Sequence, residues 1–146
     1  MCKLEMSTIQ VQVVDRVTPE FADRPALSST AAAPTSGWAR FVFPATTLFV
    51  ARSDDTIVGM FTLLLFQILT GLRAILEDLI VFFSYRRKGV GEQLMRAALV
   101  RARSAGARTV DFTSRPSRET VQRLYLRLGF AVRDTQVYRY APDRDY

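Results

Sequence analysis

The chain has 146 residues, 49% of them hydrophobic and 23% charged, which is typical of one globular domain and unlike a disordered chain. It contains no histidine and a single cysteine, Cys2, which excludes Ser-His-Asp and Cys-His catalysis and a zinc site built from these residue types. The net charge of +6 is unevenly divided, because residues 1–82 carry 6 Lys and Arg against 8 Asp and Glu, whereas residues 83–146 carry 14 against 6. The basic half indicates an anionic partner: nucleic acid, a membrane surface or a phosphate-bearing small molecule.

The sequence shows no targeting segment and no span of membrane-crossing length. Its longest apolar run, 57–69, has 13 residues, whereas a transmembrane helix needs about 20. With one cysteine the chain has no internal disulfide to form, which favours a reducing compartment. The sequence therefore predicts a cytoplasmic protein that forms a single domain over residues 1–146, with a flexible start at residues 1–8.

The segment before residue 45 is expected to begin with a strand. Alternating β-branched residues predict that strand at 9–14. Thr18-Pro19-Glu20 has the pattern of a helix start, and the small polar residues at 28–37 predict a loop. Three aromatic residues at 38–43 fit either a short helix or the wall of a pocket.

The middle of the chain is expected to form a meander of three strands. Two strands are predicted at 47–51 and 56–66, joined by the turn-forming cluster at 53–55. A third strand at 72–82 completes a long hairpin through Thr70-Gly71. The apolar run 79–83 at its end predicts burial on both faces.

After residue 83 the hydrophobic period changes from two to about four. A helix is predicted over 89–105, followed by Gly106 at the position where helix C-termini favour glycine. Its apolar stripe consists of Val90, Leu94, Met95, Ala98, Leu99 and Ala102. A strand at 108–113 follows.

A second helix is predicted to begin at Ser117, its N-cap, with Glu119 in the first turn, and to end at Gly129. Its apolar face consists of Val121, Leu124, Tyr125 and Leu128. Residues 130–140 are expected to supply the final strands. This order of elements predicts a mixed α/β domain without repeats.

The most informative motif is Arg86-Arg87-Lys88-Gly89-Val90-Gly91, between the apolar strand and the first amphipathic helix. Glycines let the backbone approach a ligand closely, and a helix N-terminus adds roughly half a positive charge. Strand, loop and helix together therefore predict a pyrophosphate site, although a glycine-assisted helix start with solvated basic side chains is the alternative. The motif is neither a P-loop, since no Lys-Ser or Lys-Thr follows the glycines, nor a dinucleotide fingerprint, since it lacks a third glycine.

These residues resemble a known family. Arg86-x-x-Gly89-x-Gly91 is similar to the Q/R-x-x-G-x-G/A signature of the GNAT superfamily of acyl-CoA-dependent N-acetyltransferases. Residues 77–81 look like the family's fourth strand, and 124–130 resemble its closing (F/L)-Y-x-x-x-G-F motif. The three motifs occur in the family's order, and the similarity extends over about 56–140. It implies an α/β (mixed α+β) fold with a central mixed, mostly antiparallel sheet that is flanked by helices and splayed at strands 4 and 5.

The resemblance implies acetyl-CoA (coenzyme A) as the cosubstrate and assigns residues to it. In the family the pantetheine arm lies between the splayed strands, bonded to strand backbone, and the loop 87–92 takes the pyrophosphate. The implied cofactor-binding residues are Leu79, Ile80, Val81, Arg86, Arg87, Lys88, Gly89, Val90, Gly91, Glu92 and Arg118. Arg118 stands where many members carry an asparagine seven residues before the tyrosine. A bound coenzyme would account for the basic half without nucleic acid.

The resemblance also implies catalytic roles. Tyr125 matches the tyrosine that protonates the departing thiolate, and a phenol with a pKa of about 10 is protonated at neutral pH. A core aromatic is the alternative reading of this residue. Glu77 is the first choice for the base that deprotonates the amine, acting directly or through water, and strand alternation places the neighbouring Asp78 on the opposite face. Asp78 and Asp111 compete with Glu77, and each carboxylate also fits a structural or solvated role. No metal is expected.

The implied function is N-acetyl transfer from acetyl-CoA to a primary amine of a small molecule or peptide, by direct attack of the amine. Two alternatives stay open: a GNAT-fold protein that binds acyl-CoA without transfer, and a basic module that binds nucleic acid. The acceptor is undefined, since Trp38, Phe41 and Phe43 fit either a pocket or a core. The expected partners are acetyl-CoA and the amine, with neither nucleic acid nor membrane, and a homodimer through the last strands is left open.

Overall fold

The computed structural model describes residues 8–14, 45–115 and 119–142. The chain divides into two compact units, residues 1–113 and 114–146, each of which is described by itself. The features predicted at 18–20, 28–37 and 38–43 lie outside the described residues, as do Ser117 and Arg118.

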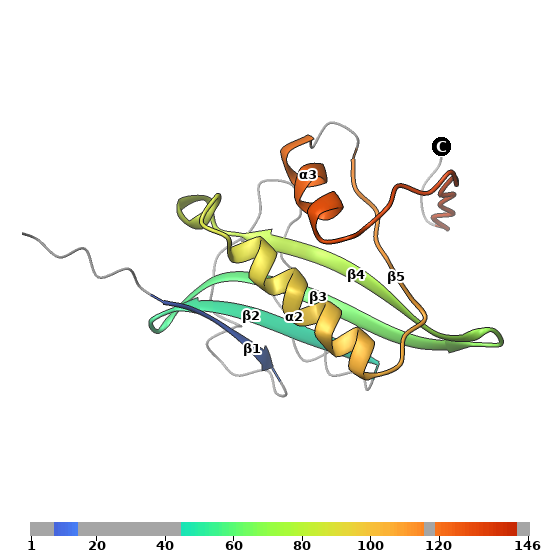
Figure 1. Cartoon of the computed structure of the whole chain (residues 1–146), viewed down its shortest axis with the longest axis horizontal. Coiled ribbons are helices and arrows are strands. Elements are labelled where there is room, and N and C mark those ends of the chain that lie inside the picture. The colour runs from blue at the N-terminus through green and yellow to red at the C-terminus, as the bar shows by residue number, and fades with distance from the viewer. Residues whose placement is uncertain (1–7, 15–44, 116–118, 143–146) are drawn as a thin grey trace, which may run out of the picture. The chain divides into compact units, whose positions relative to one another are not determined.

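The first unit is built on one five-stranded sheet whose strands follow each other in chain order (Figure 1). The strands are β1 (Ile9–Val14), β2 (Thr46–Ser53), β3 (Thr56–Ile68), β4 (Gly71–Val81) and β5 (Thr109–Asp111). The first three pairings are antiparallel and the β4–β5 pairing is parallel. This confirms the predicted mixed, mostly antiparallel sheet.

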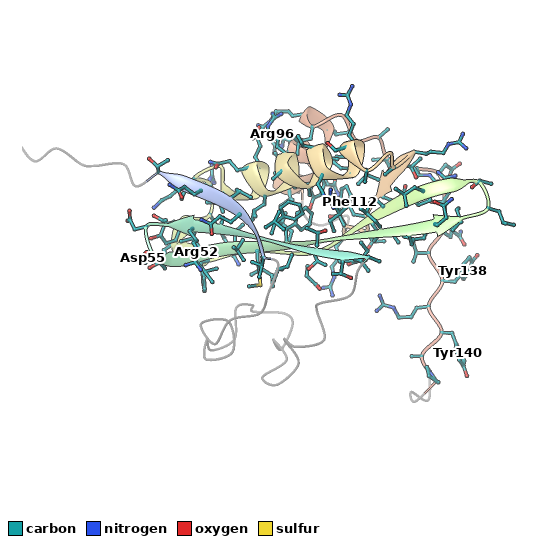
Figure 2. All side chains as sticks on the ribbon, turned by 90° about the horizontal axis from the view of Figure 1, so that it is seen from below. Arg52, Asp55, Arg96, Phe112, Tyr138 and Tyr140 are labelled. Atoms are coloured by element: carbon teal, nitrogen blue, oxygen red, sulfur yellow. The ribbon has the colours of Figure 1, made fainter. Side chains whose placement is uncertain are left out.

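One face of the sheet is covered by α2 (Val90–Ser104), as Figure 2 shows. The buried side chains of α2 are Val90, Leu94, Met95, Ala98 and Ala102, which confirms the predicted stripe except for Leu99, which is half-buried. Gly106, with φ +83°, follows the helix as expected. A short 3-10 turn, η2 (Phe83–Tyr85), stands between β4 and α2.

The opposite face of the sheet carries a second apolar cluster. Its buried residues are Leu48, Val50, Ile57 and Met60, against which Val14, Ile80 and Phe82 pack. Strand register explains this grouping, because Val50 pairs with Met60 and Met60 with Ile80. The sheet is thus apolar on both faces, and its two faces bury different side chains.

The second unit contains α3 (Glu119–Arg127). Its predicted apolar face, Val121, Leu124, Tyr125 and Leu128, is half-buried. Gly129, with φ +91°, follows the helix, and the amides of Leu128 and Gly129 bond to carbonyls of the last turn. No described helix in either unit combines the length and apolar composition needed to cross a bilayer.

Three local predictions are wrong. The strand predicted at 108–113 is only the three-residue β5. No strand occurs among the described residues 130–142, most of which are exposed; a strand forms only where another strand completes its hydrogen-bond ladder. The run 79–83 is not buried on both faces, because residues 79–82 are half-buried and Phe83, in the turn beyond the strand, is 83% exposed.

Candidate cofactor-binding and active site

The end of β4 is paired on one side only. β5 pairs with Arg73, Ala74 and Ile75, whereas β3 continues alongside β4 as far as the Gly59–Val81 pair. On the β5 side, no described strand pairs with β4 after Ile75, as expected for a sheet splayed at strands 4 and 5. Leu79, Ile80 and Val81 lie in this stretch.

A β-bulge interrupts β4 next to this stretch. Between the Met60–Ile80 and Thr62–Glu77 pairs, β4 uses one residue more than β3. Asp78 adopts φ +55°, a left-handed conformation that aspartate tolerates better than most residues. The strict alternation of the strand is therefore interrupted between Glu77 and Ile80, and the side chains of Glu77 and Asp78 are both exposed.

The loop after β4 leads directly into an uncapped helix N-terminus. Gly89, with φ +79°, is the N-cap of α2 and has no side chain to bond the first amides. The first bond of the helix runs from the Gln93 amide to the Gly89 carbonyl, at 3.0 Å. Helix geometry gives the amides of Val90, Gly91 and Glu92 no acceptor within the helix. An uncapped helix N-terminus of this kind is a position where an anion can bind.

Three cations directly precede that position in the chain. The guanidinium of Arg86 lies 5.4 Å from the ring centre of Phe83, and its Nε donates to the Val81 carbonyl at 3.2 Å. The Lys88 ammonium lies 5.0 Å from the ring centre of Tyr85. Arg87 is exposed beside them. The sequence motif does not predict these rings, although in both pairs the ring precedes its cation by three residues.

The residues present fit a diphosphate. A Cβ placed on Gly89 would meet no atom within 4 Å, so the space on that side of the Gly89 backbone is open. A Cβ on Gly91 would make only ordinary contacts, 3.7 Å to Val81 and 3.8 Å to Leu79. The one acidic group in the first turn, Glu92, is held by Arg96 at 2.8 Å. No described group of three or more His, Cys, Asp or Glu side chains is arranged to hold a metal ion.

Two of the three candidate bases share a face of the sheet. Glu77 pairs with Thr62, and Asp111 pairs with Ile75, two residues before Glu77. Residues two apart on a strand point the same way, so Glu77 and Asp111 are on the face opposite α2. Glu77 is exposed; Asp111 is half-buried, and its Oδ2 accepts from the Thr109 hydroxyl at 3.2 Å.

Tyr125 belongs to the second unit. Its ring is half-buried and meets the ring of Phe130 edge to face, with centres 6.3 Å apart. The amide of Phe130 donates to the Tyr125 carbonyl at 3.1 Å, which fixes the turn after α3. Tyr125, Gly129 and Phe130 of the closing motif thus form one local structure at the end of α3.

Arg87 provides a first test of the loop geometry, because it adopts φ +62° without being a glycine. A left-handed conformation costs roughly 1 kcal/mol for a residue with a Cβ. We expect Arg87→Gly to be more stable than Arg87→Ala by about this amount, since both remove the charge and only glycine removes the strain. Urea unfolding of the two variants measures the difference. Equal midpoints would mean that the loop does not hold Arg87 in this conformation.

Comparison with known proteins identifies the family. The model of the acetyltransferase (GNAT) family matches residues 15–130. Comparison with curated proteins gives no match.

Solved structures share the fold at low sequence identity. A transcriptional regulator from Bacillus halodurans C-125 is 21% identical with a TM-score of 0.76, covering 90% of this chain and 100% of that one. An aminoglycoside acetyltransferase from an uncultured soil metagenomic sample is 17% identical with a TM-score of 0.77, covering 93% and 97%. The aminoglycoside N-acetyltransferase AAC(6')-Iy, in complex with CoA, is 17% identical with a TM-score of 0.74, covering 93% and 96%. With the family match spanning most of its length, the chain belongs to the acetyltransferase (GNAT) family.

Proposed function

We propose that this chain is an acetyl-CoA-dependent N-acetyltransferase that acts as a single domain on a primary amine of a small molecule or peptide. The observation that carries the proposal is the uncapped N-terminus of α2, preceded by three cations and adjoining the stretch of β4 that β5 does not pair. A diphosphate and an extended pantetheine arm need these two features side by side. The family match supports acyl transfer as the reaction class.

The proposed cofactor contacts divide by chemistry. Backbone amides from Gly89 to Glu92 would bind the pyrophosphate, helped by the positive end of α2 and by Arg86, Arg87 and Lys88. Main-chain groups of Leu79, Ile80 and Val81 would hold the pantetheine arm, and their apolar side chains would keep water from it. Arg118 is proposed as a further cofactor contact.

The proposed chemistry needs one proton acceptor and one proton donor. Acetyl-CoA supplies the acetyl group as a thioester. Glu77 would take a proton from the acceptor ammonium, directly or through water, so that the neutral amine can attack; Asp111, on the same face, is the competing base. Tyr125 would give its phenolic proton to the sulfur that leaves, and the acetyl group would end on the amine without a covalent enzyme intermediate.

Acetyl-CoA binding is tested by Gly89→Trp. We expect micromolar binding of acetyl-CoA to the unaltered chain and at least about tenfold weaker binding to the variant, because the indole would lie in front of the α2 amides. The open space around Gly89 lets the chain fold, at a cost of about 1 kcal/mol for the positive φ. Calorimetric titration measures the affinity, and circular dichroism checks the fold.

The matched control is Gly106→Trp, the same change at another glycine with positive φ (+83°), after the end of α2; a Cβ there would meet no atom within 4 Å, and this variant should retain binding. If Gly89→Trp bound acetyl-CoA as tightly as the unaltered chain, the pyrophosphate would lie elsewhere.

Transfer itself is tested by the release of free thiol across a panel of amines. Aminoglycosides belong in the panel because two structural neighbours are aminoglycoside acetyltransferases; peptides and alkyl diamines complete it. Binding of acetyl-CoA without thiol release on any amine would favour the protein that binds acyl-CoA without transfer. Binding of a DNA duplex with steep salt dependence, in place of acetyl-CoA, would favour the nucleic-acid module.

A further inference from the structure

The hairpin that joins β3 and β4 ends in an exposed apolar tip, defined here as residues 66–72. In Figure 1 this hairpin projects past the end of α2 and past β5. Leu69, in the turn, is fully exposed (107%), Ile68 is 41% exposed and Phe66 is 38% exposed. Phe66 pairs with Arg73 and Ile68 with Gly71, so the two apolar side chains share one face with Arg73.

Two arginines hold the hairpin tip in its conformation. The stem of Arg108 lies against Gly71, where a Cβ would come within 2.6 Å of Arg108 Cδ, and its Nη1 donates to the Thr70 carbonyl at 2.6 Å. Arg73 donates from Nη2 to the Thr70 hydroxyl at 3.3 Å and from Nη1 to the Thr109 hydroxyl at 2.8 Å. The exposed Leu69 therefore lies in a turn whose conformation is held by hydrogen bonds from Arg73 and Arg108.

The two stretches of sequence that contain the hairpin tip and Arg108 carry basic but no acidic residues. The sequence has no Asp or Glu between Asp55 and Glu77, and none between Glu92 and Asp111. These two stretches contain Arg73, Arg96, Arg101, Arg103 and Arg108. The Glu92 carboxylate pairs with Arg96. The Asp111 carboxylate accepts from the Thr109 hydroxyl, which in turn accepts from Arg73.

We propose that the hairpin tip binds an anionic phospholipid surface. Leu69 and Ile68 would enter the boundary between headgroups and acyl chains, while Arg73 and Arg108 meet lipid phosphates with the N–H groups that the turn leaves available. The most exposed apolar side chains of the tip, Leu69 and Ile68, are aliphatic, which favours lipid over nucleic acid, where aromatic stacking is used. This proposal replaces the expectation that the chain has no membrane partner, and it does not rest on acetyl transfer.

The test is co-sedimentation of the full chain with phosphatidylcholine vesicles containing 30% phosphatidylglycerol. We expect binding that is at least about tenfold stronger than to pure phosphatidylcholine and that falls steeply between 50 and 500 mM NaCl. Leu69→Ser should lower the partition coefficient about tenfold. Arg108→Gln should lower it as well, and Arg108→Lys, which keeps the charge, should retain most of it.

The matched control is Val100→Ser, which makes the same kind of change at a 66% exposed site on α2 and should bind like the unaltered chain. Equal binding of Leu69→Ser and Val100→Ser, or no preference for anionic vesicles, would overturn the proposal. So would a dimer in vesicle-free solution that Leu69→Ser abolishes, because the tip would then bind a second copy of the chain. Acetyl-CoA titration of Leu69→Ser should match the unaltered chain, which separates this result from a failure of the proposed function.

Discussion

Replacing Tyr125 with phenylalanine is expected to lower kcat by about 10²-fold while leaving the KM for acetyl-CoA nearly unchanged. The substitution removes only the hydroxyl, so the edge-to-face contact with Phe130 is retained. A general acid contributes typically 10²- to 10⁴-fold, because without it the thiolate must leave unprotonated or take its proton from water. Steady-state kinetics of thiol release, with an amine found active in the panel, measures the effect.

The control for this prediction is Tyr138→Phe, the same chemical change at a side chain that is 87% exposed. It should keep full activity. A Tyr125→Phe enzyme within twofold of the unaltered kcat would show that Tyr125 packs the end of α3 without donating the proton. A matching loss of thermal stability in that variant would support the same conclusion.

Gly59→Val is expected to lower the free energy of unfolding by about 3 kcal/mol. Gly59 lies on β3 beneath α2, and a Cβ there would be 3.0 Å from the Ile80 carbonyl oxygen, 3.0 Å from Val90 Cγ1 and 3.2 Å from Leu94 Cδ1. The two further methyl groups of valine would have to displace the backbone at Ile80 or the buried side chains of Val90 and Leu94. Urea denaturation measures the loss.

Gly59→Ala supplies the intermediate case, with an expected loss of about 1 kcal/mol. Crowding thus predicts that stability falls from glycine to alanine to valine. Intrinsic strand propensity predicts the opposite order, because alanine and valine both favour a strand over glycine, on a scale of about 1 kcal/mol. A valine variant as stable as the glycine protein would mean that α2 stands farther from β3 than described.

The sequence predicts well those elements whose pattern is local. The stripe of α2 recurs at helical spacing, and its most buried members, Leu94, Ala98 and Ala102, are all among those expected. The β3–β4 hairpin follows from two apolar runs around Thr70-Gly71. These patterns work because each residue's environment depends mainly on neighbours a few positions away.

Other features depend on partners far along the chain. No turn residue marks the bulge at Asp78; it arises from the register between β3 and β4, and a left-handed aspartate without a following glycine gives a weak signal. The shortness of β5 and the absence of a strand at 130–140 likewise depend on which strands meet. Side-chain faces counted by alternation along β4 therefore cannot be carried across the bulge between Glu77 and Ile80.

In the candidate site, too, the features formed by adjacent residues are predicted, whereas those that depend on strand pairing are not. The loop from Arg86 to Gly91 is placed correctly between a strand and a helix, because its glycines and charges are adjacent in sequence. The shared face of Glu77 and Asp111 needs the parallel register of β4 and β5. The roles of these residues and of Tyr125 stay predictions for the kinetics above.

The three-pair contact between β4 and β5 also bears on the order in which the first unit assembles. β2, β3 and β4 are joined by tight turns, so their pairing closes small loops and can form early. β5 reaches β4 only after the chain has passed through the whole of α2, and it gains three residue pairs by doing so. We therefore expect the meander to form first and the strand that borders the splay to dock last, onto an edge that is already formed.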